Sequence, residues 1–346
     1  MGKYVLKRLA LAFITAFIIL SLTYILVAAL PIIGGGFGKE SSMFAYYQDQ
    51  VKLGYALDFA TRQEGLGTEL WSFVDTNGIS HYWYKRPIID LYFNWIKNIV
   101  TKWDWGRSTQ IKLNASAMSI ILQRLPVSMY LNIISVIISV PLGILLGIWA
   151  GLKKNTWIDH TISTLVMIFI SIPSFVVITF LIWIFSYQLG WLPTQWPSAI
   201  MPNDIKVLGY IIPVVSLSFG SVCGYTRFVR AELCEVMSSE YLLLARTKGL
   251  TKNQAIVRHA LRNAFVPILP SILAEFIGIL GGSMILESIY GIPGIGFLYI
   301  TALNMKDYSV LMVDMAVFTM ISLMAGIVLD LSYGFIDPRI RMGAKK

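Results

Sequence analysis

The residues that could do chemistry are few and lie far apart in this sequence. The two cysteines, Cys223 and Cys234, form no Cys-x-x-Cys pair, and His81, His160 and His259 are widely separated. Neither group has the spacing of a disulfide framework or a metal site. The sequence contains no Gly-x-x-x-x-Gly-Lys-Ser/Thr loop for nucleotide phosphates, no paired carboxylates and no Ser/His arrangement. We therefore expect no catalytic residue, no metal and no cofactor bound by this chain itself.

Four carboxylates fall in apolar surroundings, where a charge is expensive. Glu275 lies near the middle of the apolar run 266–288, whereas Glu287, Asp314 and Asp330 lie toward the ends of such runs. We interpret these three as interfacial. A charge in the middle of a span faces a water-filled path or a partner, so Glu275 is a candidate pathway residue that could attract a peptide amino terminus or another cation. One such charge gives little support to a cation-coupled secondary transporter, which needs convergent charges in two repeats.

Apolar segments must position these residues. Of 346 residues, 56% are hydrophobic and 14% are charged, and soluble proteins carry about 25% charged residues. Crossing a bilayer takes about 20 apolar residues, and six runs qualify, at about 9–30, 126–151, 161–187, 207–226, 266–288 and 310–334. The first run exceeds the apolar region of a signal peptide, so we interpret it as a retained span. The prediction is an all-α polytopic membrane protein with six transmembrane helices.

Basic residues indicate the orientation of these spans. With the amino terminus inside, the segments 1–8, 152–160, 227–265 and 335–346 hold 16 Lys and Arg, whereas the two short outer loops hold only Lys206 and Lys306. Long outer segments are discounted in this rule. We therefore expect a multi-pass protein of the cell membrane with both termini cytoplasmic. The net charge of +9 reflects topology rather than binding of nucleic acid.

This topology divides the chain into three parts. They are the amino-terminal helix 1–30, a large extracytoplasmic segment 31–124, and a five-helix core 125–346. The outer segment carries five tryptophans, and tryptophan settles both in folded cores and at membrane surfaces. The segment is thus a small folded cap or interfacial belt, or else a docking surface for an extracytoplasmic partner. The tryptophans are Trp71, Trp83, Trp95, Trp103 and Trp105.

The inner segment 227–265 is too long for a simple connection. It predicts two short helices, because Gly249 suits the end of one and Thr251 can cap the next. Apolar residues such as Leu243 and Val257 alternate there with Lys and Arg. A basic amphipathic segment of this kind lies on a lipid surface or enters the groove of a cytosolic partner.

The same segment resembles the coupling loop of binding-protein-dependent ABC transporter permeases. The sequence EYLLLARTKGL at 240–250, followed by RHALRNAFVPILP at 258–270, is similar to the oligopeptide/dipeptide B-type form of the peptide/nickel subgroup. The Glu-Ala-Ala of the general permease pattern is replaced here by Leu243, Leu244 and Ala245, which suits the peptide branch. The resemblance implies that the ATPase-coupling residues are Glu240, Tyr241, Ala245, Lys248, Gly249, His259 and Asn263.

Four further motifs resemble the family and follow its order. DWGRS at 104–108 and LQRLPVSMYLN at 122–132 precede and enter the second span. LESIYGIPGIG at 286–296 resembles the turn after the fifth span, with Tyr290 in place of the usual Phe, and DLSYGFIDPRIR at 330–341 resembles the ending. The resemblance covers about 1–30 and 104–341 and leaves the segment 31–103 uncovered.

The resemblance implies a type I ABC importer permease fold with an insertion after the first helix. It implies half of a translocation pathway that works by alternating access. The expected partners are a second homologous permease, two cytosolic ATPase subunits that bind the ATP, an extracytoplasmic substrate-binding protein and membrane lipid. The long outer segment and the lack of a His or Cys cluster favour oligopeptides as substrate; dipeptides and nickel are the alternatives.

Overall fold

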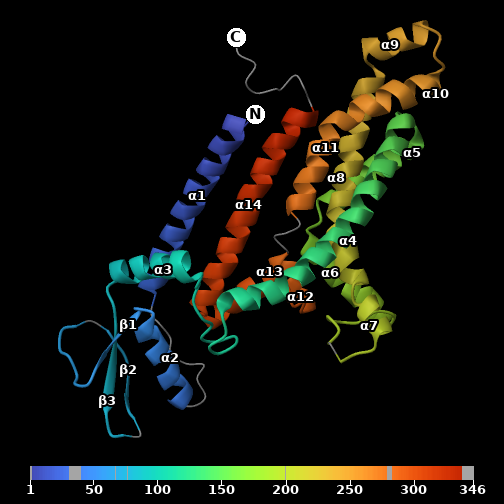
Figure 1. Ribbon diagram of the computed structural model, residues 1–346. Coiled ribbons are helices and arrows are strands. Elements are labelled where there is room, and N and C mark those ends of the chain that lie inside the picture. The colour runs from blue at the N-terminus through green and yellow to red at the C-terminus, as the bar shows by residue number, and fades with distance from the viewer. Residues whose placement is uncertain are drawn as a thin grey trace. The chain divides into compact units, whose positions relative to one another are not determined.

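The computed structural model describes residues 2–30, 40–66, 68–75, 77–198, 200–278 and 283–336, and Figure 1 shows their helices and strands. The chain divides into two compact units. The sheet unit consists of Ala10–Leu125 and Leu298–Met320, and the helical unit of Met1–Leu9, Pro126–Phe297 and Ile321–Lys346. Four helices contribute residues to both units: α1 (Gly2–Ala29), α4 (Ala117–Leu152), α13 (Ile295–Met305) and α14 (Tyr308–Ile336).

The sheet unit takes its name from a three-stranded antiparallel sheet. β1 (Ala56–Phe59), β2 (Glu69–Val74) and β3 (Ser80–Lys85) pair in the order β1-β3-β2. Asp75 begins the turn between β2 and β3, and its Oδ1 accepts hydrogen bonds from the backbone N–H groups of Ile79 and Asn77 at 2.8 and 2.9 Å. These bonds lower the pKa of Asp75. The all-α prediction is therefore wrong for residues 56–85, although the other elements named among the described residues are helices.

Aromatic side chains form the core of this sheet. The indole of Trp83 is fully buried and stacks on Trp71, with ring centroids 5.2 Å apart. Tyr47 of α2 (Glu40–Lys52) stacks on the same indole at 5.4 Å. Large rings bury much apolar area from few residues, which lets a small layer fold. This packing fits the folded-cap interpretation of the segment.

The sheet is fixed to the end of α1 within the same unit. Lys85, the last residue of β3, donates from Nζ to the carbonyl oxygens of Ala28 at 2.6 Å and Leu30 at 3.4 Å. A cation is favourable there because the last carbonyls of a helix carry partial negative charge. Burial lowers the pKa of the Lys85 ammonium. After β3 the chain enters α3 (Ile88–Lys102).

The helical unit is built around α4 and α8 (Ile211–Met237). Its buried apolar residues form clusters between these helices and their neighbours, for example Leu131 with Ile178 and Ile212. The other elements of this unit are α5 (Trp157–Ile170), α6 (Ser174–Leu181), the π-helix η1 (Ile182–Gln188), α7 (Asn203–Leu208), α9 (Glu240–Thr247), α10 (Lys252–Ala255), the π-helix η2 (Ile256–Ala260), α11 (Leu261–Gly278) and α12 (Met284–Tyr290).

Three glycines let α4 and α8 approach closely. Gly143, Gly147 and Gly151 recur every fourth residue and so share one face of α4. A Cβ at Gly143 would lie 2.6 Å from the Cβ of Tyr225, and one at Gly147 would lie 2.7 Å from the Cβ of Val229. Small residues at this spacing are typical of close helix packing in membranes. We call this contact the glycine seam; none of the motifs quoted above includes these three glycines.

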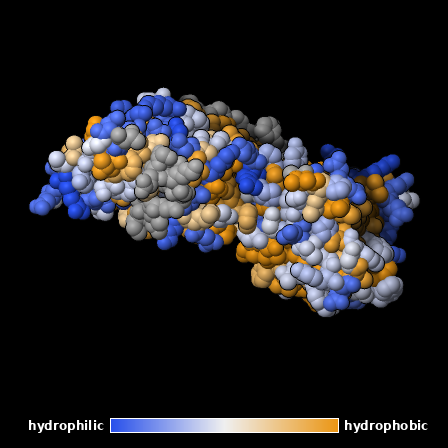
Figure 2. All heavy atoms as spheres, turned by 90° about the horizontal axis from the view of Figure 1, so that it is seen from below, coloured by the Kyte–Doolittle hydropathy of each residue, from blue (hydrophilic) through white to orange (hydrophobic). Residues whose placement is uncertain are grey.

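Among the described residues, four helices are long and apolar enough to cross a membrane, or up to six if each of two bent pairs counts as one span. The pairs are Trp157–Ile170 with Ser174–Gln188, bent by 97°, and Met284–Tyr290 with Ile295–Met305, bent by 84°. Many large hydrophobic side chains on these helices are exposed, and Figure 2 shows hydrophobic residues gathered in patches on the face that it presents. Such exposed apolar surface suits contact with lipid.

The predicted spans differ from the observed helices in two places. The third run, 161–187, bends where Pro173 follows α5, because proline cannot continue the hydrogen-bond pattern of the preceding turn. The fifth run, 266–288, is not one described helix: α11 ends at Gly278, α12 begins at Met284, and residues 279–282 lie outside the described residues. The third span is therefore bent, and the predicted count of six spans is reached among the described residues only if each bent pair counts as one span.

Candidate functional site

The inner segment folds as the short helices α9, α10 and η2, and Gly249 ends the first of them. Gly249 adopts φ +97°, where a side chain would be strained. Its N–H donates to the carbonyl of Arg246 at 3.0 Å, and the N–H of Leu250 donates to that of Ala245 at 3.4 Å. These two bonds are those of a Schellman motif. The predicted break at Gly249 is confirmed.

Thr251 begins the second helix, as the sequence predicts. Its Oγ1 accepts from the backbone N–H of Gln254 at 3.3 Å, and the Gln254 Oε1 accepts from the backbone N–H of Thr251 at 3.1 Å. This reciprocal pair is a capping box. The chain turns sharply here, because a single residue separates Gly249, which ends α9, from Thr251, which caps α10.

An apolar cluster holds this turn on the end of α8. Leu242 of α9 and Ile256 of η2 are buried against Leu233, and Ala255 and Ala260 belong to the same cluster. Burying apolar surface is the main favourable term in such contacts. The loop is thus a packed continuation of α8 rather than a free segment.

The opposite side of the loop presents apolar side chains to solvent. Leu243 is 63% exposed, Leu244 56% and Val257 65%, and Tyr241 is also exposed. We call these four residues the coupling surface. Exposed basic residues accompany them: Arg246, Lys248, Lys252, Arg258 and Arg262.

The residues that the resemblance assigns to coupling all lie on this loop or directly after it. Glu240, Tyr241, Lys248, Gly249, His259 and Asn263 are exposed, and Ala245 is half-buried. Glu240 stands in the first turn of α9, where a negative charge faces the positive end of the helix. The structure therefore gathers them in one place, and their role in coupling stays a prediction.

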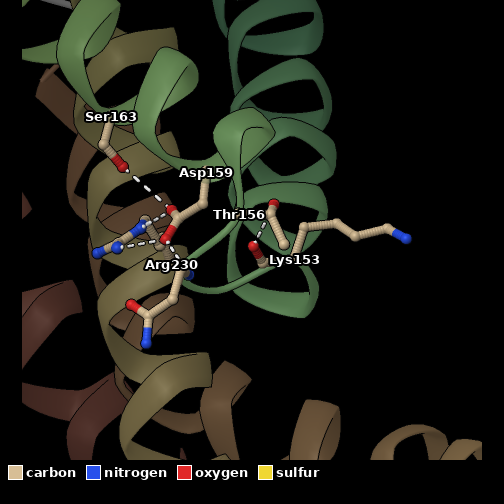
Figure 3. Close-up of polar contacts among 6 residues, drawn as sticks. Lys153, Thr156, Asp159, Ser163 and Arg230 are labelled. Atoms are coloured by element: carbon tan, nitrogen blue, oxygen red, sulfur yellow. Dashed lines mark hydrogen bonds and ion pairs between the residues drawn. The ribbon is translucent and has the colours of Figure 1, made fainter.

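An ion pair that the sequence analysis missed fixes the helix that carries the loop. Asp159 of α5 is fully buried, and Figure 3 shows its carboxylate facing Arg230 of α8. Arg230 donates from Nη2 to Asp159 Oδ2 at 2.8 Å, and its Nε also contacts Oδ1. Ser163 Oγ and the Asn155 N–H donate to the same carboxylate at 3.2 and 3.0 Å. A bidentate Arg–carboxylate pair fixes orientation as well as distance.

Two of the family-like motifs contact each other inside the helical unit. Ser128 of the LQRLPVSMYLN motif donates from Oγ to Oε1 of Glu287 at 2.7 Å and accepts from the N–H of Ile295 at 2.9 Å. The N–H of Phe297 donates to Glu287 Oε2 at 2.9 Å. A Cβ at Gly294 would clash with both side chains. Glu287 is thus enclosed by its own chain, whereas the sequence interpretation places it at the interface.

The DWGRS motif has a similar contact inside the sheet unit. Ser108 Oγ donates to Oδ2 of the buried Asp307 at 2.5 Å and accepts from the N–H of Lys112 at 2.9 Å. The N–H groups of Gln110 and Ile111 donate to the same carboxylate oxygen, both at 3.0 Å. Asp307 directly precedes α14, and no motif in the sequence analysis includes it.

Glu275, the candidate pathway residue, is half-buried on α11. Its carboxylate interacts with the side chain of Tyr225 on α8. The Tyr225 hydroxyl donates its hydrogen bond to the carbonyl of Ser271 at 3.1 Å. The residue thus links two helices of the helical unit, and its role toward a substrate stays a prediction.

Two further predictions concern the carboxy-terminal motif and metal binding. Residues 337–341 of the DLSYGFIDPRIR motif lie outside them. Within the described ranges, no group of three or more His, Cys, Asp or Glu side chains is placed to hold a metal ion.

Comparison with known proteins gives one family. Residues 143–342 match the model of the binding-protein-dependent transport system inner membrane component. The chain is 32% identical over 343 residues to the dipeptide transport system permease protein DppB of Lactococcus lactis subsp. cremoris, covering 99% of this chain and all of that one. It is 31% identical over 342 residues to the oligopeptide transport system permease protein OppB of Escherichia coli K12, with the same coverage.

A solved structure agrees at the level of the fold. An inward-facing MetNI methionine ABC transporter chain matches with a TM-score of 0.51 and 17% identity, over 64% of this chain and 97% of that one. At this identity the likeness concerns the fold alone. The family match covers more than half of the chain, and the full-length relatives agree with it. This chain therefore belongs to the binding-protein-dependent transport system inner membrane component family.

Proposed function

We propose that this chain is a permease subunit of an ATP-driven peptide importer. It forms half of the translocation pathway together with a second, homologous permease. Two cytosolic ATPase subunits bind and hydrolyse ATP, and an extracytoplasmic binding protein delivers the peptide. The full-length similarity to dipeptide and oligopeptide permeases supports the class of substrate.

One observation carries the coupling part of this proposal. The coupling surface exposes four large apolar side chains on a loop that is rigidly capped and packed onto α8. An apolar surface among basic residues fits a protein groove, because burial supplies affinity and charge sets the register. ATP-driven closure of the ATPase pair would pull on residues 240–262 and so rock α8.

The orientation belongs to the same proposal. Both termini and the loop 227–265 lie in the cytoplasm, the segment 31–124 lies outside, and the core 125–346 forms the pathway. The distribution of Lys and Arg supports this arrangement. The three-stranded sheet at residues 56–85 then belongs to the outer segment.

The coupling test uses a double substitution, Leu243→Glu with Leu244→Glu. Both side chains are exposed, so the permease should fold and insert while its affinity for the ATPases is lost. The matched control is Val74→Glu with Ile79→Glu, which places two charges on exposed apolar positions of the β2–β3 hairpin. Co-purified ATPase per permease is the measurement. Undiminished co-purification of the loop variant would contradict the proposal.

The substrate test is uptake by the reconstituted complex, with a peptide-length series and nickel as a control. We expect peptides to be transported and nickel not, and the length optimum separates an oligopeptide importer from a dipeptide importer. Glu275→Gln removes the candidate pathway charge while keeping the size of the side chain. Unchanged uptake of cationic and neutral peptides by this variant would remove Glu275 from the pathway.

A further inference from the structure

The helix α3 presents three different faces. Leu91, Trp95 and Asn98 are buried within the sheet unit. A second face exposes Ile89, Phe93 and Val100, which are 60%, 62% and 78% exposed, and Trp103 continues it at the end of the helix. The spacing 89, 93, 100 keeps these residues on one stripe. We call Ile89, Phe93, Val100 and Trp103 the apolar stripe.

The third face of α3 is polar and also exposed. Asp90, Lys97 and Thr101 lie there, next to the apolar stripe around the helix. The helix therefore has an apolar and a charged strip side by side on its uncovered surface. This division is typical of a helix that lies in a membrane interface.

Contacts with α1 place α3 beside the last turns of that apolar helix. The Tyr92 hydroxyl donates to Ser21 Oγ at 2.8 Å, and the Tyr24 hydroxyl donates to the carbonyl of Leu91 at 3.2 Å. The ring of Tyr24 also stacks on Trp95, with centroids 4.4 Å apart. Ser21 and Tyr24 belong to the last turns of the apolar helix Val5–Ala29, and Figure 1 shows α3 lying across that end of α1.

Contacts on the other side fix which way α3 faces. Asn94 donates to the carbonyl of Gly54 at 2.8 Å, and Asn98 donates to that of Leu53 at 3.0 Å. These bonds attach the buried face of α3 and its edge to the turn between α2 and β1. By helical spacing the apolar stripe lies on the side of α3 opposite to these two bonds, and large apolar side chains of α1, such as Ile18 and Leu22, are exposed as well.

We propose that the apolar stripe of α3 is a lipid-binding surface, seated in the membrane interface where α1 ends. Phospholipid acyl chains that cover α1 continue over Phe93 and Val100, while Lys97 reaches the phosphate headgroups. Trp103 lies at the headgroup level, where indole rings settle. Through α3 the bilayer then holds the sheet unit at a fixed height, whatever substrate the importer carries.

Spin labels on single cysteines test this position in the full chain. Cys223 and Cys234 are first replaced by serine, and labels are placed at Phe93→Cys, Val100→Cys and Lys97→Cys. The protein is reconstituted in nanodiscs of equal parts phosphatidylethanolamine and phosphatidylglycerol. The measurement is the collision rate of each label with oxygen, which concentrates in lipid, and with a water-soluble nickel chelate. Val74→Cys is the matched control, an exposed apolar position on β2.

We expect an oxygen-to-nickel collision ratio at positions 93 and 100 several-fold above that at positions 97 and 74. Equal ratios at all four positions would overturn the proposal, because the apolar stripe would then face water. Low collision rates with both reagents at positions 93 and 100 would also overturn it, since a protein partner would then cover the stripe. Labels at exposed positions perturb folding little, and the mobility of the Val74→Cys label checks that the sheet is intact.

Discussion

The buried carboxylates and the coupling surface are opposites: the first places charged groups in the interior, and the second places apolar groups on the surface. Asp159, Glu287 and Asp307 are buried, and each is bound by several donors of the same chain. The coupling surface instead places large apolar side chains in solvent. Buried charges are costly when a partner is lost, whereas exposed apolar groups cost the isolated chain little. Substitutions in the first region should therefore destabilise the permease, and those in the second should weaken its assembly.

The largest loss of stability is expected for Arg230→Leu. It leaves the fully buried Asp159 without its cation, and removing one partner of a buried pair costs about 3–5 kcal/mol. Thermal unfolding of the purified permease should show a clear fall in melting temperature. The double variant Arg230→Leu with Asp159→Asn should recover part of this loss. If Arg230→Leu were as stable as the parent, the ion pair would make no contribution to stability.

The two buried serines should differ from each other. Ser128→Ala removes the 2.7 Å bond to Oε1 of Glu287, where the bond from the N–H of Ser283 is longer, at 3.4 Å, and should cost about 2–3 kcal/mol. Ser108→Ala leaves Asp307 Oδ2 with two backbone donors at 3.0 Å, and should cost about 1–2 kcal/mol. Melting temperatures of the two variants give the order, and the reverse order would mean that the backbone bonds do not compensate.

Removal of the capping box should have a smaller and local effect. Thr251→Ala removes the side-chain acceptor for the Gln254 N–H, and loss of such a cap costs about 1 kcal/mol. Hydrogen exchange should speed up in α10 and η2 while α4 keeps its protection. Thr251→Ser restores the hydroxyl and should restore the protection. Faster exchange throughout the helical unit would show that the loop and the core unfold together.

The smallest effect on stability is expected on the coupling surface itself. Val257→Ser changes a side chain that is 65% exposed, and such surface substitutions stay within about 0.5 kcal/mol. The same variant should nevertheless release the ATPases more readily, measured as co-purified ATPase per permease. A large fall in melting temperature would show that Val257 supports the fold of the isolated chain, and the contrast between the two regions would then fail.

Local signals in the sequence are sufficient for part of this structure. Gly249 and Thr251 act within a few residues, so the break and the cap of the loop can be predicted from them. The apolar runs at about 9–30 and 310–334 correspond to α1 and α14, because a long apolar run is likewise a signal within a single segment. The membrane class follows from composition alone.

Contacts between distant residues could not be predicted in this way. Ser128 and Glu287 each belong to a recognisable motif, but nothing in either motif says that the two meet. Asp307 stands outside every motif, and its partner Ser108 lies 199 residues away. The sheet at residues 56–85 is stabilised by rings from α2 as well as from its own strands, which a pattern within one segment does not reveal.

The glycine seam has a mechanical consequence. At Gly143 and Gly147 the two backbones are so close that an added carbon would collide with α8, and no soft layer of long side chains separates the helices there. Close-packed interiors have low compressibility and transmit strain. A displacement of the end of α8 that carries the loop is therefore transmitted directly to α4, because few side chains can rearrange between the two helices.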